Sequence, residues 1–288
     1  DVSAVLCMYL AGEGVGEAAD ALLWGDANPA GHLPETWPLR LEDTPCYLDY
    51  PGDGVTADYR EGVFVGYRWY DARRMAVRWP FGHGLSYTGF VYRDDALDRP
   101  TLTEDGEATL RVRIRNSGAV PGAEVVQLYV SDATGAPAPG GRVPQALRGF
   151  QKVRLEPGQE CEICFTLTAR DLSHYDERLH GWYAAPGRYE LRLGHSSRDI
   201  RITVPLQFET QRFPPLTVDG TTPLGLLLAD PRTAVTAQKL LDGRGGDGDG
   251  LMPPEAMAQM LDATPLRELT DCSAPDGLLA ALRRDAGE

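Results

Sequence analysis

Two cysteines three positions apart are the first residues whose spacing could carry chemistry. Cys161 and Cys164 form a C-x-x-C pair within residues 160–167, ECEICFTL. Such a pair can bind zinc or exchange a disulfide, but a redox pair opens a helix, and this run has the pattern of a strand. On a strand, residues three apart point to opposite faces. We therefore expect two structural thiols.

Two glycine-rich segments also resemble ligand-binding loops. Gly12, Gly14 and Gly16 lie between a predicted strand and a predicted helix, as in a phosphate-binding turn, but the spacing is not G-x-G-x-x-G and Glu13 would face the phosphate. Residues 243–250, GRGGDGDG, contain the Asp-x-Asp-Gly of a calcium loop without its other oxygen ligands. The sequence predicts a flexible linker there, and it predicts no cofactor and no metal.

The first segment, residues 1–98, alternates between predicted strands and helices. Residues 4–10 have the pattern of a buried strand, and residues 17–24 that of a helix that Gly25 ends. Because the sequence opens within that strand, without an initiator Met or a signal peptide, we expect the chain to be the C-terminal piece of a longer protein. The alternation predicts a mixed α/β segment.

The second segment, residues 99–208, has the period-two pattern of strands. In residues 110–115 the apolar side chains take one face and three arginines take the other. Further strands are predicted at residues 124–130, 149–155, 160–168, 189–193 and 199–205. This pattern is typical of an antiparallel β-sandwich.

The third segment, residues 209–288, is predicted to be a short helical extension that contains the Gly/Asp-rich linker. Asp230–Pro231 is a helix-start pair. Apolar residues recur at helical spacing beyond it, at Met257, Met260, Leu261, Leu278, Leu279 and Leu282.

Composition narrows the function classes. The 288 residues carry 28 Lys and Arg against 42 Asp and Glu, a net charge of −14. Such an acidic chain is a poor candidate for nucleic-acid binding or for an anionic membrane surface. The odd number of cysteines, five, slightly favours a reducing, cytoplasmic compartment. Neither the composition nor the sequence patterns indicate an oligomeric state.

Three long motifs are more specific than these patterns of period and composition. They occupy residues 25–38 (GDANPAGHLPETWP), 59–71 (YREGVFVGYRWYD) and 79–90 (WPFGHGLSYTGF). In order and spacing they resemble the C-terminal part of family three glycoside hydrolases. Residues 116–130, 147–153 and 194–200 are similar to that family's fibronectin type III-like domain. The resemblance implies a partial α/β sandwich, flavodoxin-like, followed by that domain.

The resemblance also implies a chemistry, the retaining hydrolysis of terminal β-linked sugars by a β-glucosidase or, next, a β-xylosidase. This reaction needs two carboxyl groups about 5 Å apart. In the family, the nucleophile is an Asp on a TIM barrel and the acid/base is a Glu on the α/β domain, upstream of the first residue here. We therefore expect no catalytic residue in this chain, which alone should be inactive. The expected partner of the complete enzyme is a β-linked oligosaccharide or aryl glycoside.

Three residues remain as substrate-pocket candidates, Glu61, Tyr67 and Arg68, because sugar pockets combine aromatic and charged groups. The alternative is that Glu61 pairs with Arg68 while Tyr67 packs inside the domain. A rival function is a non-catalytic structural or carbohydrate-binding module, for which Trp182 and Tyr183 are the available aromatic residues. The short, aromatic junction at residues 84–92, with Tyr87, Phe90 and Tyr92, favours instead a sandwich packed against the first segment.

Overall fold

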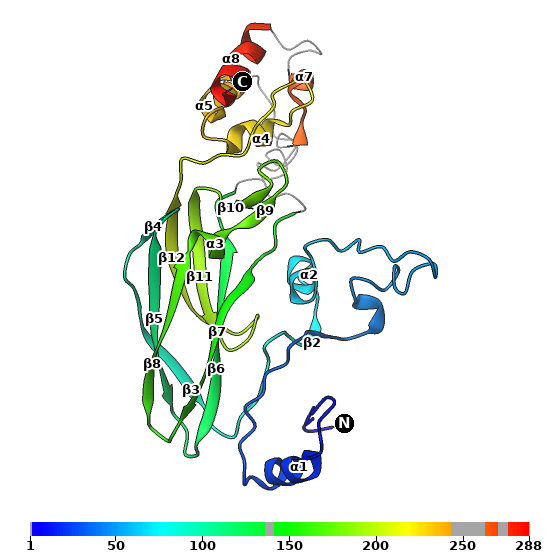
Figure 1. The fold of residues 1–288 in the computed structure, drawn as a ribbon, viewed down its shortest axis with the longest axis vertical. Helices are drawn as coiled ribbons and strands as arrows, with labels where there is room; N and C mark the ends of the chain where they lie inside the picture. The colour runs from blue at the N-terminus through cyan, green and yellow to red at the C-terminus, as the bar shows by residue number, and fades with distance from the viewer. Residues whose placement is uncertain (1, 136–140, 243–262, 270–275, 288) are drawn as a thin grey trace, which may run out of the picture.

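The structure is a computed structural model that describes residues 2–135, 141–242, 263–269 and 276–287. A two-sheet sandwich forms the centre of the molecule, the first segment runs along one side of it, and the C-terminal helices lie at one end (Figure 1). This arrangement confirms the predicted fold class, a mixed α/β segment followed by a β-sandwich and helices. In the described part of the chain, no helix has the length and apolar character to cross a membrane.

The first segment contains little regular structure. Its elements are α1 (Val15–Trp24), β1 (Trp37–Pro38), the 3-10 helix η1 (Leu41–Asp43), α2 (Tyr67–Ala72) and β2 (Val77–Trp79), with β1 and β2 paired antiparallel. Helix α1 ends as predicted at Gly25, whose φ of 86° is left-handed. The buried strand predicted at residues 4–10 is wrong: these residues form no strand and most are exposed. A run of strand-forming residues becomes a strand only when a neighbour supplies the ladder hydrogen bonds, and no described strand lies beside it.

The sandwich consists of a three-stranded and a five-stranded sheet. The first has the order β3-β5-β8 and the second the order β4-β12-β11-β6-β7, in which β4 and β12 are parallel and the other pairs antiparallel. The strands are β3 (Phe90–Leu97), β4 (Thr101–Thr103), β5 (Glu107–Asn116), β6 (Gly122–Asp132), β7 (Ala146–Leu155), β8 (Glu160–Thr168), β11 (Gly187–Gly194) and β12 (Ile200–Glu209). A short helix, α3 (Ala169–Leu172), and the hairpin of β9 (His174–Asp176) and β10 (Gly181–Tyr183) complete it.

Alternation along the strands builds the core, as predicted. On β5 the side chains alternate strictly between buried and outward positions, so Leu110, Val112 and Ile114 meet the inner face of the other sheet. On β8, Cys161 packs against the core while Cys164 is exposed, and both thiols are free, so the prediction of opposite faces is confirmed. The other two free cysteines of the described chain, Cys7 and Cys46, lie in the first segment.

Strand β6 departs from alternation. Its residues from Val126 to Ser131 are all buried, because the core covers one face and the first segment covers the other. Strand β3 pairs with β5, so it belongs to the sandwich although it precedes residue 98. Of the aromatic residues at the junction, Phe90 and Tyr92 lie on β3 and pack against the sandwich's own core. Tyr87 does not, since its side chain is exposed and only its hydroxyl is anchored, by donating to the Leu22 carbonyl at 2.6 Å.

The C-terminal helices form a small core of their own. They are α4 (Leu224–Ala229), α5 (Ala234–Asp242), α7 (Leu266–Leu269) and α8 (Asp276–Ala286). Leu224, Leu227 and Leu282 are fully buried in a cluster that does not join the core of the sandwich. The prediction of a helix at Leu278, Leu279 and Leu282 is confirmed, whereas the predicted linker at residues 243–250 and the residues Met257, Met260 and Leu261 lie outside the described part.

Candidate functional site

Tyr67, the first residue of α2, lies against the sandwich. Its hydroxyl accepts a hydrogen bond of 2.8 Å from the backbone N–H of Leu147, on β7. Its ring lies 4.9 Å from that of Phe81 and 5.9 Å from that of Tyr129, on β6. These contacts involve both ends of the side chain, so Tyr67 holds α2 on the outer face of the five-stranded sheet.

Glu61 and Arg68 lie beside this contact but are not joined to it. Among the described residues, no ion pair links the two, so the expected internal pair does not form. The Oε2 atom of Glu61 is buried and has no hydrogen-bond partner in the described chain. The charge of Arg68 acts on Arg148, whose guanidinium pKa is lowered first by burial and then by that charge. Tyr67, Glu61 and Arg68 thus do not converge on one described group.

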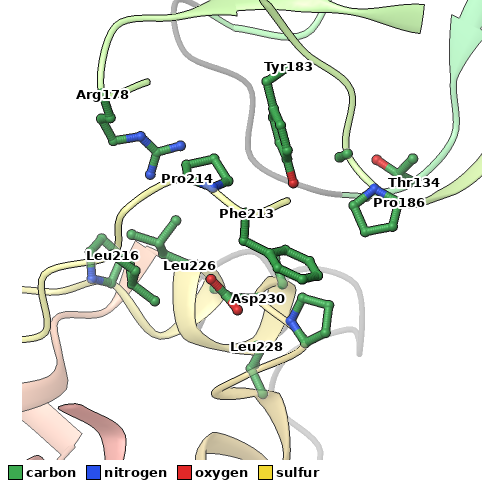
Figure 2. Close-up of a pocket in the computed structure, with 16 residues that line it drawn as sticks. Thr134, Arg178, Tyr183, Pro186, Phe213, Pro214, Leu216, Leu226, Leu228 and Asp230 are labelled. Atoms are coloured by element: carbon green, nitrogen blue, oxygen red, sulfur yellow. The ribbon is translucent and has the colours of Figure 1, made fainter. Parts of the chain in front are cut away.

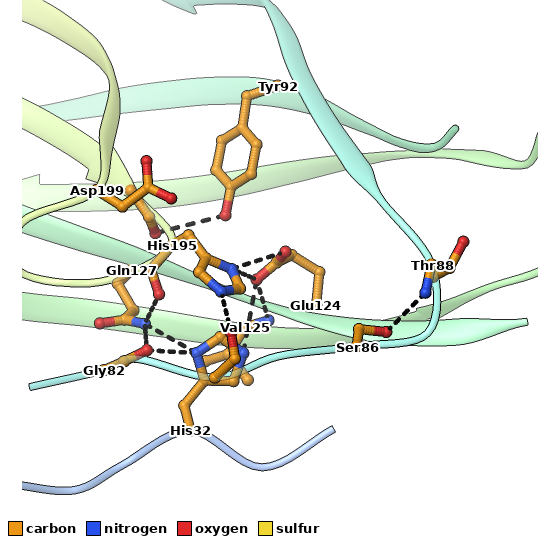
Figure 3. A network of polar contacts seen from close by, with 12 residues as sticks. His32, Gly82, Ser86, Thr88, Tyr92, Glu124, Val125, Gln127, His195 and Asp199 are labelled. Atoms are coloured by element: carbon orange, nitrogen blue, oxygen red, sulfur yellow. Dashed lines mark hydrogen bonds and ion pairs between the residues drawn. The ribbon is translucent and has the colours of Figure 1, made fainter. Parts of the chain in front are cut away.

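A polar cluster lies where the first segment meets the sandwich (Figure 3). His195, in the turn between β11 and β12, places Nδ1 2.9 and 3.0 Å from the two carboxylate oxygens of Glu124 on β6. His32, from the irregular segment before β1, places Nε2 3.7 Å from Glu124 Oε1. The two imidazole rings lie 4.6 Å apart, edge to face. One histidine of the sandwich and one of the first segment therefore share the carboxylate of Glu124.

The remaining nitrogen of each histidine faces a backbone carbonyl. Nδ1 of His32 lies 2.5 Å from the oxygen of Gly82, and Nε2 of His195 lies 2.7 Å from the oxygen of Gly84. Because a carbonyl oxygen only accepts, each of these nitrogens carries a hydrogen. His32 Nε2 and His195 Nδ1 are then the nitrogens that face Glu124.

Burial and charge act differently on the two imidazoles. Burial lowers the pKa of His32, and the charge on His195 lowers it further. Burial also opposes charge on His195, but the hydrogen bond and the negative charge of Glu124 outweigh it, so the pKa of His195 is raised. Glu124 is almost fully buried, and a buried carboxylate needs a paired charge. The raised pKa of His195 favours the charged imidazole, whose Nδ1 faces both oxygens of Glu124.

The surrounding contacts fix the backbone on which the cluster stands. Gln127 Nε2 donates to the carbonyl oxygens of Gly82 at 3.1 Å and of His195 at 2.6 Å. Gly82 has a left-handed φ of 78°, and a Cβ there would collide with the Gln127 side chain. Farther along the junction, Arg198 donates to Asp71 at 2.8 Å and to the carbonyl of Met75 at 2.9 Å. These hydrogen bonds hold the first segment against the sandwich at several points along the junction.

Sequence reasoning did not find this cluster. His32 lies in the motif at residues 25–38 and His195 in the segment 194–200, but neither histidine has a partner at a spacing typical of a site. One signal was available: residues 125–131 of β6, VVQLYVS, lack charge on both faces, which indicates a strand covered on both sides.

The larger described cavity lies elsewhere, between the end of the sandwich and the C-terminal helices (Figure 2). It has a volume of about 750 Å³, and Tyr183, Phe213, Pro214 and apolar residues of α4 line much of it. Its one carboxylate, Asp230, is paired with Arg232 at 2.6 Å. A second cavity, of about 430 Å³, is lined by Asp71 as its one carboxylate. Neither lining offers the two carboxylates of a glycosidase site.

Two family descriptions match the chain. Residues 1–87 match the Glycosyl hydrolase family 3 C-terminal domain, and residues 124–197 match the Fibronectin type III-like domain. The first covers the segment beside the sandwich and the second covers most of the sandwich itself. The domain order agrees with that of the motifs in the sequence.

Several curated relatives are similar to this chain. It is 40% identical over 199 residues to thermostable beta-glucosidase B of Acetivibrio thermocellus, a match over 69% of this chain and 26% of the relative. It is 37% identical to beta-glucosidase BoGH3A of Bacteroides ovatus, over 72% and 28%. An exo-alpha-(1->6)-L-arabinopyranosidase of Bifidobacterium breve matches at 34% over 92% of this chain and 34% of the relative. The chain thus spans about a quarter to a third of the length of these relatives.

Solved structures agree with this fold. A beta-glucosidase of Bifidobacterium adolescentis matches with a TM-score of 0.67 at 33% identity. The match covers 78% of this chain and 32% of the beta-glucosidase chain. Beta-glucosidase 3B of Thermotoga neapolitana, solved in complex with glucose, has a TM-score of 0.65 at 33% identity, over 73% and 29%.

Proposed function

This chain belongs to glycosyl hydrolase family 3, and from that premise we propose that it is part of a retaining, exo-acting β-glycosidase that releases terminal β-linked glucose. The observation that carries the proposal is the 40% identity over 199 residues to a beta-glucosidase, together with the matches to both family domains. In this mechanism one carboxylate attacks the anomeric carbon while a carboxylic acid protonates the leaving oxygen.

We assign neither carboxylate to the 288 residues. The two described cavities each have a single carboxylate in their lining, and each of these is held by an arginine. The role proposed for this chain is instead to brace the enzyme. Hydrogen bonds of Tyr67, Arg198 and Gln127 hold the first segment against the outer face of the five-stranded sheet. The sandwich would thereby stabilise the position of the α/β domain to which the first segment belongs.

The assay uses the 288-residue chain and the whole protein that contains it. The whole protein should release nitrophenol from p-nitrophenyl β-glucopyranoside with retention of configuration, which proton NMR of the first-formed sugar reports. The chain alone should give no turnover above buffer. Turnover by the chain that a single substitution within it abolishes would contradict the assignment.

A pentose-releasing enzyme is the second candidate. The relative whose match extends over 92% of this chain, into the C-terminal helices, is named as an arabinopyranosidase. Comparing the specificity constants of the whole protein on p-nitrophenyl β-glucopyranoside, β-xylopyranoside and α-L-arabinopyranoside separates the candidates. We expect the glucoside to be preferred, and a tenfold preference for either pentoside would overturn that choice.

A carbohydrate-binding module is the rival from another class. Stacking on a sugar needs an open aromatic face, but Tyr183 is buried and Trp182 carries the Arg170 guanidinium 3.2 Å from its ring centroid. The edge contact with Tyr175 restricts Trp182 further. We expect no retardation of the chain in gels that contain soluble β-glucan, and retardation that Trp182→Ala abolishes would favour the rival.

A further inference from the structure

We propose that His32, Glu124 and His195 form a zinc-binding site that ties the first segment to the sandwich. Two imidazoles and one carboxylate are a common ligand set for zinc. The three ligand atoms, His32 Nε2, His195 Nδ1 and a Glu124 oxygen, lie within 4.8 Å of one another. All three side chains are largely buried, with 9%, 2% and 19% exposed for His32, Glu124 and His195.

The strongest support is the orientation of the two rings. Histidines that bind a metal almost always donate their other N–H to a carboxylate, a backbone carbonyl or water, which fixes the tautomer and the ring plane. Here both rings do so, His32 to Gly82 O and His195 to Gly84 O. The two nitrogens left for a metal therefore point at the same carboxylate, from opposite sides of the junction (Figure 3).

The two separations from Glu124 are close to those of a zinc site. Zinc bonds of about 2.0–2.1 Å in a tetrahedron separate neighbouring ligand atoms by roughly 3.3 Å. The observed separations from Glu124 Oε1 are 2.9 Å to His195 Nδ1 and 3.7 Å to His32 Nε2, one below and one above that value. A water would complete the fourth position, as in other zinc sites with three protein ligands.

Zinc replaces a proton in this arrangement. Without the metal, His195 Nδ1 faces the two oxygens of Glu124 and Nε2 faces the carbonyl oxygen of Gly84, so the charged imidazole can donate from both nitrogens. When Zn²⁺ binds, the proton on Nδ1 leaves to solvent, the nitrogen lone pair takes the metal, and Glu124 and His32 bind through an oxygen and Nε2. The zinc site goes beyond the proposed hydrolase activity, and it stabilises the contact between the two domains.

The site has one ligand in each of three distant segments, which is why no spacing in the sequence predicts it. His32 stands on a loop of the first segment, Glu124 on β6 and His195 on the turn after β11. A metal held this way would cross-link the segments, so its binding free energy adds to the stability of the docked form.

The test is calorimetric titration of Zn²⁺ alone into the chain after treatment with EDTA. We expect one zinc per chain. The melting temperature should rise by about 5–10 °C when the free zinc concentration is about a hundred times the dissociation constant. His32→Gln and His195→Gln should each weaken binding at least about tenfold. Circular dichroism shows that the variants fold, and His32, on an irregular segment, is the one whose replacement disturbs the sandwich least.

Two matched controls exclude binding elsewhere. His180→Gln removes an exposed histidine outside the cluster, and Cys164→Ser removes the exposed thiol of the C-x-x-C pair. Both should keep the wild-type affinity, and Co²⁺ in place of zinc should give no sulfur-to-metal charge-transfer band. Absence of zinc binding in the wild type, or loss of binding in a control with retention in His32→Gln, would overturn the proposal.

Discussion

The sandwich and the first segment differ most in what their apolar side chains touch. In the sandwich, Leu110, Leu191 and Leu193 have no exposed surface. In residues 2–89, Tyr70 is the one buried apolar side chain, whereas Leu23 and Trp24 of α1 are 66% and 79% exposed. Helix α1 has an amphipathic sequence, yet none of its residues is buried. The difference shows that a local pattern shapes an element, while burial against another element stabilises it.

The largest expected difference is in the unfolding of the two regions when each is prepared as a separate fragment. Residues 90–211, which include β3, should unfold cooperatively in urea, because both sheets and their shared core are complete within them. Residues 1–89 alone should show no cooperative transition. Circular dichroism of the two fragments measures this, and a sharp melting transition in residues 1–89 would remove the contrast.

Truncating one leucine in each region tests the same contrast within the chain. Leu191→Ala opens a cavity in the sandwich core and should lower the free energy of unfolding by about 2–5 kcal/mol. Leu23→Ala, on the exposed face of α1, should change it by less than about 0.5 kcal/mol. Urea denaturation gives both values, and equal losses would mean that α1 is packed in solution.

A buried carboxylate provides the next smaller effect. Asp176 is fully buried and accepts hydrogen bonds from Arg178 Nε at 3.1 Å and Nη2 at 2.6 Å, which lower its pKa although burial opposes this. Asp176→Asn should cost about 1.5–3 kcal/mol at pH 7.

The pH dependence of that cost follows from the direction of the shift. A carboxyl whose pKa is lowered on folding contributes fully above its ordinary pKa of 3.8 and loses the contribution as the pH falls through the folded value. The gap between wild type and Asp176→Asn should therefore narrow below pH 3.8. The matched control is Asp58→Asn, which removes the exposed ion pair with Arg60 in the first segment and should have no measurable effect. A gap that widened with acid would contradict the assigned pair.

The smallest effect lies at the contact between the regions. Tyr67→Phe removes the hydroxyl that accepts the Leu147 N–H and should cost about 1 kcal/mol. In the whole enzyme it should leave KM for the aryl glucoside unchanged, because Tyr67 faces the sandwich. A rise in KM without a loss of stability would place Tyr67 in the substrate pocket instead. Arg68→Gln, beside it, is the companion variant, and we expect it to change KM more than Tyr67→Phe does.

The sequence by itself determined the elements whose signals are local. Alternation gave β5 and β8 with the correct inner face, and the glycine after Trp24 gave the end of α1, because side-chain period and left-handed φ are properties of a few adjacent residues. The long motifs identified both domains, since they preserve many neighbouring residues together.

Only the tertiary structure decided which surfaces meet. The apolar run at residues 4–10 could not become a strand without a neighbour, and Tyr67 found its partner on β7, 80 positions away. The burial of both faces of β6 and the meeting of His32, Glu124 and His195 depend on how the first segment docks. Docking is set by the fit of side chains from distant segments, and no periodicity or spacing along the chain records that fit.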